Sequence, residues 1–407
     1  MTLTRFFLVA GLLFVSSLGL AQTITVSGLA RDRATREPLA FASVSILGRS
    51  IATVTNLNGE FDFHLPAEYR NEILVISMLG YANFEAPVWS VMSASGQPQV
   101  FELDKSPTVL QEIVVADTLS GGDIFRIALS RIEENYPMKS FLLDGFYRDA
   151  KKVGGTYISL LEAAVRIYDD DYREPRNRFR LRERVKLIEV RQSLGYENKF
   201  TPYFDQDNLL EDLLLHNNIR YRQFENDDAF LKSVNRERDT HYNGHPIFVV
   251  TYNEDFSLKA YIDKRNYAII HLETETGPTG QIVSRRKGMY STFDGLKKTI
   301  DFKQYQGKMY VNYMTVTSMI NWYDSRTNDL NFETELYQEL LINKVTPETS
   351  ERITSTEKMK NYGLQYQDRP YNKDFWANYN VIKETPLDRK ILADLEKQIP
   401  LEEQFEN

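Results

Sequence analysis

Five cations at alternate positions are the residues whose spacing most clearly suggests chemistry. They are Arg178, Arg180, Arg182, Arg184 and Lys186. If this segment is a β-strand, alternate side chains point to one face, so the five cations would form a single stripe. Such a stripe could bind phosphate, lipopolysaccharide or an acidic glycan. The alternative, which we favour, is a solvated strand face or a sheet edge that is protected by charge.

Carboxylates form a second candidate group. The run Asp169-Asp170-Asp171 could bind a cation or act in acid/base catalysis. An exposed loop that pairs with the nearby arginines is the interpretation we favour. A hydrolase that uses carboxylates such as Glu162 and Asp170 is kept as a hypothesis.

Common catalytic and cofactor signatures are missing from the sequence. The chain has no Gly-rich phosphate loop, no Gly-x-Ser-x-Gly elbow and no His-Glu-x-x-His motif. Zero cysteine excludes disulfides, thiolate metal sites, cysteine nucleophiles and a lipid anchor on an acylated cysteine. We therefore expect a protein that is not an enzyme, with no catalytic, cofactor-binding or metal-binding residues and no cofactor.

Two histidines have the spacing of a metal-binding pair. His241 and His245 are four residues apart, as zinc ligands on one face of a helix would be. Asn243-Gly244 lies between them and Pro246 follows, and these residues favour a turn between two strands. The segment is therefore predicted to be a hairpin turn without a metal.

The composition indicates a folded protein with at least two domains. The chain has 407 residues, of which 42% are hydrophobic and 26% are charged. One hydrophobic core rarely grows past about 250–300 residues. The net charge is −8, which gives no support to nucleic acid as a partner. Residues 173–199 differ from this average, because nine basic and four acidic residues give them a charge of +5.

The first residues have the pattern of a signal peptide, predicted here over residues 1–21. Arg5 is followed by an apolar run from Phe6 to Leu20, and small residues precede Gln22 where cleavage is expected. The alternative is an uncleaved anchor, although the run is shorter than the roughly 20 residues of a spanning helix. We expect an exported protein with no transmembrane span after cleavage.

Residues 22–104 are predicted to form a small antiparallel β-sandwich. Short strands alternate with turn residues, among them Asn58-Gly59, which favours a tight turn. Phe61, Phe63 and Leu65 follow this turn at period two, so they share one buried face. Many short strands with turns between them are typical of a sandwich.

Three motifs in this region resemble the carboxypeptidase-like regulatory domain. Gly28 to Val44 resembles the opening of that family, Thr53 to Phe61 its central turn, and Ser77 to Tyr81 its strand end. The resemblance implies a seven-stranded, transthyretin-like β-sandwich, as found at the front of exported and outer-membrane proteins of Bacteroidetes. It also implies a location in the periplasm or at the periplasmic face of the outer membrane. Asn56 stands where the family usually has Asp, which argues against a cation site at this turn.

The family name does not imply peptidase activity. A zinc carboxypeptidase needs a His-x-x-Glu motif, a distant histidine and a second glutamate as base. None of the five histidines of this chain is followed by glutamate at the third position. The resemblance is therefore one of fold.

A linker and a second domain follow. Residues 105–122 are the predicted linker, and its apolar patch Leu110–Val115 is interpreted as a last strand that pairs back onto the sandwich. Residues 123–345 are predicted to be a curved antiparallel β-sheet domain with a few helices. One helix begins near Asp123, which is expected to cap it, and ends at Tyr136-Pro137.

Other elements of the second domain follow from local patterns. Residues 208–216 are predicted to be a short helix, and two strands are expected around Gly154-Gly155. Residues 332–345 fit either a helix or a strand, and we favour a strand because a meander precedes them. Residues 346–407 are predicted to be a charged C-terminal extension with a short helix at residues 387–398.

The second domain carries weaker resemblances. Gly145–Arg148, Leu161–Ala164 and Tyr242–Gly244 resemble uncharacterised Bacteroidetes proteins that carry the regulatory module at their front. A helix followed by the strands Tyr261–Asp263 and Tyr267–Ile269 resembles the half-barrel of Lol-type lipoprotein carriers. The second resemblance implies a curved sheet with a concave apolar face that can hold an acyl chain.

Three functions stay open from the sequence. The function we favour is a non-catalytic, exported cell-envelope binding protein whose second domain holds a lipid, a lipoprotein or a glycan. The second is a structural adaptor that docks on an outer-membrane protein through the β-sandwich. The third is the hydrolase that uses Glu162 and Asp170.

Overall fold

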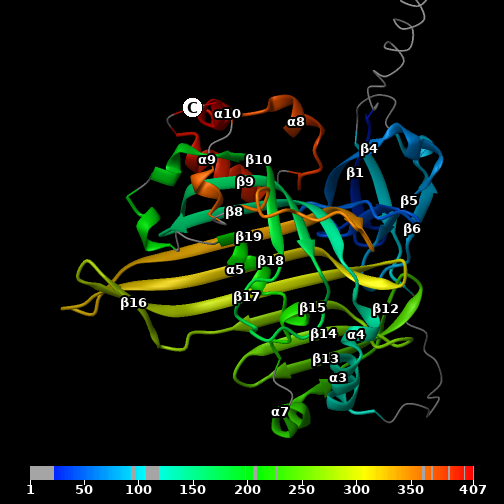
Figure 1. Ribbon diagram of the computed structural model, residues 1–407, viewed down its shortest axis with the longest axis horizontal. Helices are drawn as coiled ribbons and strands as arrows, with labels where there is room; N and C mark the ends of the chain where they lie inside the picture. The colour runs from blue at the N-terminus through cyan, green and yellow to red at the C-terminus, as the bar shows by residue number, and fades with distance from the viewer. Residues whose placement is uncertain are drawn as a thin grey trace, which may run out of the picture.

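The computed structural model contains one small β-sandwich and one large β-sheet (Figure 1). It describes residues 23–92, 98–106, 119–197, 199–204, 209–224, 227–359, 363–367, 370–383, 386–397 and 399–406. The predicted signal peptide and most of the predicted linker, including its apolar patch, lie outside these residues. Within them, no helix is long and apolar enough to cross a membrane.

The β-sandwich has seven strands in two sheets, which confirms the fold that the sequence motifs imply. Its first strand pairs with its last in parallel, so the prediction of an antiparallel sandwich is wrong for this pair. Alternating residues of the strands meet between the sheets, and Val26, Phe61 and Phe63 are completely buried there. Two short helical turns, η1 (Ala67–Asn71) and α2 (Val88–Val91), lie beside the strands. The first sheet has the order β4-β1-β7, and the second β3-β2-β5-β6. The strands are β1 (Thr23–Asp32), β2 (Ser43–Ile46), β3 (Ala52–Val54), β4 (Glu60–Pro66), β5 (Ile73–Ser77), β6 (Phe84–Pro87) and β7 (Gln99–Leu103).

The large sheet has twelve strands, and all of their pairings are antiparallel. Its main path runs β10-β9-β8-β19-β18-β17-β15-β14-β13-β11, with β12 beside β13 and β16 beside β17. The sheet is curved and does not close (Figure 1). Its strands are β8 (Phe141–Val153), β9 (Thr156–Asp169), β10 (Arg184–Gln192), β11 (Asn235–Arg236), β12 (Thr240–Tyr242), β13 (His245–Asn253), β14 (Ser257–Asp263), β15 (Ile269–Thr276), β16 (Ile282–Arg286), β17 (Met289–Tyr305), β18 (Lys308–Asp324) and β19 (Leu330–Thr346).

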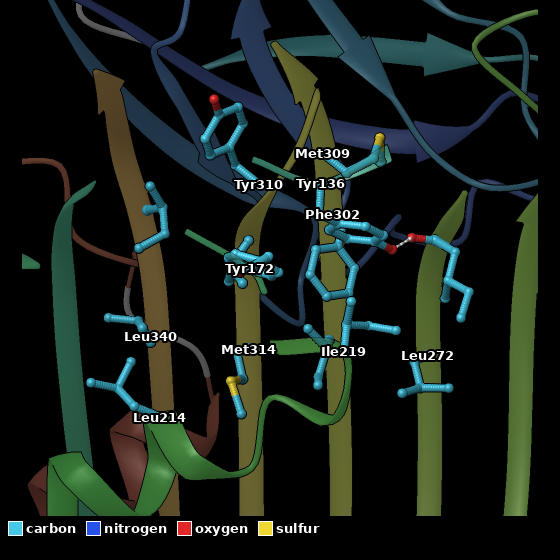
Figure 2. Packing of buried hydrophobic residues seen from close by; sticks show 14 of the residues in the cluster. Tyr136, Tyr172, Leu214, Ile219, Leu272, Phe302, Met309, Tyr310, Met314 and Leu340 are labelled. Atoms are coloured by element: carbon cyan, nitrogen blue, oxygen red, sulfur yellow. Dashed lines mark hydrogen bonds between the residues drawn. The ribbon is translucent and has the colours of Figure 1, made fainter. Parts of the chain in front are cut away.

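One face of the large sheet, which we call the helix face, is covered by five short helices. Their apolar residues pack on the strands to form the largest core of the molecule. Figure 2 shows part of this core, where Tyr136 stacks on Tyr172 and meets the edge of Phe302. The hydroxyl of Tyr136 donates to the carbonyl of Ile269 at 2.6 Å. The helices are α3 (Gly121–Ser130), α4 (Ile132–Asn135), α5 (Leu209–Leu215), α6 (Asn218–Tyr221) and α7 (Asp228–Ser233).

The opposite face, which we call the sandwich face, is covered by the β-sandwich and the C-terminal extension. Val54 of the sandwich, Tyr313 of the sheet and Trp376 of the extension belong to one hydrophobic cluster. Backbone bonds also join the units, because the N–H of Val345 donates to the carbonyl of Ser50 at 2.9 Å. The extension contains η4 (Leu364–Tyr366), α8 (Lys373–Asn378), α9 (Pro386–Leu395) and α10 (Leu401–Glu406).

Several predicted elements of the large sheet are confirmed. β19 is a strand, and α5 matches the second predicted helix. Gly154 and Gly155 form the turn between β8 and β9, with φ values of +52° and +82°. Asn243 and Gly244 form the predicted hairpin turn, with φ values of +50° and +75°. The two nearby histidines therefore lie on facing strands of a hairpin and not on one face of a helix.

Two predictions of local structure are wrong. Asp123 does not occupy the capping position of α3, because Ser120 is the N-cap residue. Ser120 Oγ accepts a hydrogen bond from the N–H of Asp123, and the Asp123 carboxylate accepts one from the N–H of Ser120. This reciprocal pair is a capping box, in which Asp123 takes the third helical position. The extension also has more helix than the single predicted one, since α8 and α10 flank α9.

Candidate functional site

A cavity of about 330 Å³ lies between the β-sandwich and the sandwich face of the large sheet. Its volume is at the lower end of the range for small-molecule sites, which are mostly apolar with a few polar groups. Thr299 lines this cavity and also a more open groove across β13, β14, β15 and β17. The cavity therefore adjoins a solvent-accessible surface.

The sandwich wall of the cavity is largely apolar and comes from the three sequence motifs of the regulatory domain. Phe41 belongs to the first motif, Leu57 to the central turn, and Met78 and Leu79 to the third motif. Leu57 is 42% exposed, which is unusual for a leucine beside a cavity. Three segments that are separate in the sequence thus form one apolar wall opposite the large sheet.

Phe41 has a strained backbone at the point where the sandwich meets the sheet. Its φ of +59° is one that bulky L-residues rarely adopt. Its ring stacks on Tyr313 of β18, with ring centroids 5.3 Å apart. Its N–H donates to the carbonyl of Thr55 at 3.1 Å, which holds this conformation. Strain at a residue that lines a cavity is consistent with a functional constraint.

The sheet wall of the cavity is polar because strand residues alternate between the two faces. His271 of β15, Asp301 of β17 and Thr315 of β18 point to the cavity side. Their neighbours in the same strands belong to the core of the helix face. These neighbours are Leu272, Ile300 and Met314.

His271 is held between two carboxylates. Its Nδ1 lies 2.6 Å from Asp301 Oδ1, and its Nε2 lies 2.9 Å from Glu273 Oε1. Burial disfavours the charged imidazolium, but Asp301 and then Glu273 outweigh this effect and raise the pKa of His271 to about 10. His271 is therefore protonated at neutral pH, and it cannot serve as a general base there.

Asn312 places an unpartnered acceptor in the sheet wall. The pairing of β17 with β18 shifts register between Asp301 and Phe302, so that Asn312 is an extra residue of β18 without a partner in β17. Its side chain lines the cavity, and the residue is only 4% exposed. Its Oδ1 has no hydrogen-bond partner among the residues that the structure describes. A buried carbonyl without a partner is costly, so such atoms call for an explanation.

Lys303 lies at the same interface. Its Nζ donates to Ser43 Oγ of the sandwich at 2.9 Å. Burial lowers the pKa of Lys303 to about 7, because the ammonium loses hydration and no carboxylate compensates it. The same interface therefore raises the pKa of His271 and lowers the pKa of Lys303.

Two of the three tyrosines of the cavity wall direct their hydroxyls away into an ion-pair network, while the Tyr242 hydroxyl lies 3.5 Å from Ser77 Oγ. Tyr313 and Tyr337 both donate to Glu339 Oε2, at 2.8 and 2.9 Å. Arg148 Nη1 donates to Glu339 Oε1 at 2.9 Å. The wall therefore presents the rings of the two tyrosines, while Glu339 satisfies their hydroxyls.

The same network contains one of the two carboxylates of the hydrolase hypothesis. Glu162 accepts from Arg148 and Arg191 at 2.7 and 2.6 Å. Burial opposes ionisation of Glu162, but Arg191 and Arg148 outweigh it and lower its pKa to about 2. Asp170 accepts from the hydroxyl of Tyr168 instead. Asp170 directly follows β9, and eight residues of extended chain span about 26 Å, so the two residues are too far apart along the strand to form a catalytic pair.

The acidic run was predicted to be an exposed loop that pairs with nearby arginines, and only the pairing is confirmed, for Asp169 and Asp171. The exposure is wrong for these two residues, because Asp169 ends β9 and both are buried. Asp169 is buried and binds Arg220 of α6, with N–O distances of 2.5 and 2.9 Å. Asp171 lies 3.5 Å from Arg173 and 3.7 Å from Arg182. Within the described residues, no group of three or more His, Asp or Glu side chains is placed to hold a metal ion.

The five predicted cations do not lie on one strand face. β10 begins at Arg184, so only Arg184 and Lys186 belong to a strand. The preceding chain is irregular, since Asn177 Oδ1 accepts from the N–H of Phe179 at 2.9 Å. This local bond favours a turn over an extended strand.

Most of these cations already have partners within the chain. Arg184 donates to the carbonyl of Ile353 at 3.1 Å. Three others lie beside carboxylates, at N–O distances of 2.6, 3.7 and 2.7 Å: Arg178 beside Glu174, Arg182 beside Asp171, and Lys186 beside Glu357. Arg180 lies exposed in the irregular segment. Binding of an anionic ligand by these cations stays a prediction.

Asn56 has a structural role that an aspartate could not fill. Its Oδ1 accepts from the N–H groups of Asn58 and Glu60, at 2.9 and 2.8 Å. Its Nδ2 donates to the carbonyl of Lys383 in the C-terminal extension at 3.3 Å. A carboxylate has no proton to donate there. The amide therefore joins the central turn of the sandwich to the extension.

Sequence reasoning missed the polar residues of the cavity. His271, Asp301 and Asn312 come from three strands, and the sandwich wall ends at Leu79, 192 residues before His271 in the chain. The available signal was a single charged residue between apolar ones, as in Ile270-His271-Leu272 and Ile300-Asp301-Phe302. Such a residue on a strand with both faces covered must find a buried partner.

The family comparison agrees with the sandwich. Residues 26–115 match the family model of the CarboxypepD_reg-like domain. The resemblance drawn from the three motifs is thus confirmed for this part of the chain. No curated protein matches the chain.

Similarities to solved structures are distant. A structure titled lipid-protein interactions in lipovitellin is 9% identical, with a TM-score of 0.25, and the match covers 57% of this chain and 28% of that one. The MucA/MucB complex of Pseudomonas aeruginosa is 8% identical over 56% of this chain and 99% of that one, with a TM-score of 0.18. A putative membrane-associated protein of unknown function from Bacteroides fragilis is 10% identical over 79% of this chain and 98% of that one, with a TM-score of 0.15. Scores this low carry no argument about fold or function.

Proposed function

We propose that this protein, in which a CarboxypepD_reg-like domain docks on a large sheet, is a non-catalytic binding protein of the cell envelope. It holds one small apolar or amphiphilic molecule, such as a lipid chain, in the cavity between the two units. The observation that carries this proposal is the cavity itself, with an apolar sandwich wall and a polar sheet wall. The proposed place is the periplasm or the periplasmic face of the outer membrane, as the predicted signal peptide and the family suggest.

The electrostatics of the cavity favour binding over catalysis. His271 is the one histidine in its lining, and both of its ring nitrogens are engaged by carboxylates. A raised pKa of about 10 keeps it protonated, so it does not activate a nucleophile at neutral pH. Glu162 and Asp170 are too far apart to act together. These points support a protein that is not an enzyme.

The helix face is the less suitable place for the ligand. The lipoprotein-carrier resemblance implied an apolar face that holds an acyl chain, but α3 to α7 cover the helix face with their own side chains. A ligand there would have to displace packed residues such as Tyr136 and Phe302, at a cost of several kcal/mol. The cavity on the sandwich face needs no such displacement.

A cavity-filling substitution tests this proposal. Thr315→Trp places a large ring in the cavity, and Thr317→Trp is the matched control, two residues farther along β18 and outside the lining. Native mass spectrometry of protein isolated from the cell envelope should find a bound small molecule in the parent protein and in the control. The cavity-filled variant should lack it. Absence of any bound molecule, together with no binding from envelope lipid extracts, would contradict the proposal.

The adaptor is the second candidate function, and an exposed aromatic residue favours it. Trp89 of α2 is 58% exposed on the sandwich, and tryptophan is enriched at the centres of protein interfaces. The proposed partner is an outer-membrane protein. Cross-linking in intact cells should capture a reproducible partner with the parent protein and lose it with Trp89→Ala. An unchanged set of cross-links would remove this candidate.

A further inference from the structure

The polar wall of the cavity contains acceptors that no donor of the described chain satisfies. Asn312 Oδ1 is one, as it is buried and has no partner. Asp301 supplies a second acceptor, because His271 takes its Oδ1 and no hydrogen bond to its Oδ2 is found among the described residues; its side chain is 28% exposed, so this oxygen is accessible and not buried. Both residues line the same cavity. This wall therefore has unsatisfied capacity for accepting hydrogen bonds.

Three of the side chains in the sheet wall have their donors in use. The hydroxyls of Tyr313 and Tyr337 donate to Glu339. Both nitrogens of His271 contact carboxylates. The other hydroxyls of the lining can donate or accept, so they do not discriminate between ligands; they belong to Ser43, Ser77, Tyr242, Thr299 and Thr315. A ligand that carries hydrogen-bond donors can therefore satisfy acceptors of this wall that the protein leaves unsatisfied.

The charge of the His271 cluster also disfavours an anionic head group. One protonated histidine and two carboxylates, Asp301 and Glu273, give the His271 cluster a net charge of −1, and Lys303, which binds Ser43 of the sandwich wall, is the cation at this interface. A carboxylate or phosphate head group would face this negative charge and leave both acceptors unsatisfied. A hydroxyl or ammonium group would satisfy them.

We infer that the ligand is an amphiphile whose polar end is a hydrogen-bond donor without negative charge, an alcohol or an ammonium group. Its apolar part lies against Phe41, Leu57, Met78 and Leu79 of the sandwich. Its polar end binds Asn312 Oδ1 and Asp301 Oδ2. This inference rests on the proposed function, and it adds the chemical class of the ligand.

Three probes with the same dodecyl chain test the inference on the full-length protein. They are dodecylglycerol, which is a neutral donor, dodecylamine, which is a cationic donor, and laurate, which is an anion without a donor. Calorimetric titration at neutral pH should give affinities for the two donor probes that are at least about tenfold higher than for laurate, the ratio expected from one well-placed hydrogen bond. Equal or tighter binding of laurate would overturn the inference and leave the proposed function standing.

Two variants separate the roles of the acceptors. Asn312→Ala should weaken dodecylglycerol binding about tenfold with no change for laurate, while Asp301→Asn should weaken dodecylamine and strengthen laurate. Thr317→Ala, which lies outside the lining, is the control that should change none of these affinities. Variants with unchanged preferences would overturn the inference. If none of the three probes binds the parent protein, the proposed function is overturned, and the inference fails with it.

Discussion

The two faces of the large sheet are built from the same strands but differ in what covers them. The helix face is covered by segments of the same domain, and its apolar residues pack into one continuous core. The sandwich face is covered by a separate domain and by the C-terminal extension, and it contains a cavity. Buried ion pairs occur on both faces, between Arg148 and two glutamates on the sandwich face and between Arg220 and Asp169 on the helix face. A face that two independent units cover together leaves room between them, whereas a face covered by local helices closes completely. Function is therefore expected where the units meet.

The largest effect is expected from a truncation on the helix face. Phe125 of α3 is completely buried, and its ring meets the edges of Phe224 and Phe230. Phe125→Ala should lower the free energy of unfolding by about 3–5 kcal/mol, because it removes contacts and leaves a void. Leu57→Ala, in the partly exposed wall of the cavity, should cost under about 1 kcal/mol. Urea denaturation measures both, and similar values would remove the distinction between the faces.

A comparable loss is expected from the buried ion pairs of the sandwich face. Arg148→Ala should destabilise the protein by about 3 kcal/mol or more, since it removes the guanidinium that two buried carboxylates, Glu162 and Glu339, share, and Glu162 keeps only its pair with Arg191. Arg166 is the matched control, because it lies on the neighbouring strand and its pairs with Asp144 and Glu351 are partly exposed. Arg166→Ala should cost within about 1 kcal/mol. A small effect of Arg148→Ala would mean that the network is hydrated.

His271 and Lys303 should make opposite pH-dependent contributions to the free energy of unfolding. The folded pKa of His271 is raised to about 10, so its stabilising contribution is complete below its ordinary value of 6.5 and is lost as the pH rises toward 10. The pKa of Lys303 is lowered from 10.5 to about 7, so its protonation opposes folding near neutral pH, and stability is regained as the pH rises toward 10.5.

Single variants separate these contributions. Relative to the parent protein, His271→Gln should make the free energy of unfolding rise more steeply between about pH 7 and about pH 9.5, while Lys303→Met should make it rise less or fall. Denaturant titrations at the two pH values give both slopes. Changes of the same sign in the two variants would contradict the assignment of either pKa.

A smaller effect tests the strain at Phe41. Its positive φ favours glycine over alanine by about 1 kcal/mol, while both substitutions remove the stacking on Tyr313. Phe41→Gly should therefore be less destabilising than Phe41→Ala by about 1 kcal/mol in chemical denaturation. The reverse order would show that the backbone adopts another conformation at this residue.

Much of the fold was predictable from local sequence. Asn243-Gly244 and Gly154-Gly155 need positive φ, so they mark hairpins, and Phe61 and Phe63 alternate as in a half-buried strand. The alternating cations wrongly predicted a strand at Arg178 to Arg182. This segment is irregular, and the hydrogen bond from the N–H of Phe179 to Asn177 Oδ1 favours a turn there.

The candidate site could not be predicted from the sequence. Its wall joins Phe41 to Asp301 and Asn312, and this contact exists only once the sandwich docks on β17 and β18. Nothing in the pattern of one strand tells which of its two covered faces will be closed and which will keep a cavity. Tertiary docking decides this.

The location of the bound molecule tests the central claim most directly. A dodecylglycerol probe with a photoreactive group in its chain can be activated on the full-length protein, and the modified peptides identified by mass spectrometry. The account predicts labels in residues 77–79 of the sandwich and residues 312–315 of β18, with loss of both in Thr315→Trp. Labels on α5 or around Tyr136, on the helix face, would contradict it.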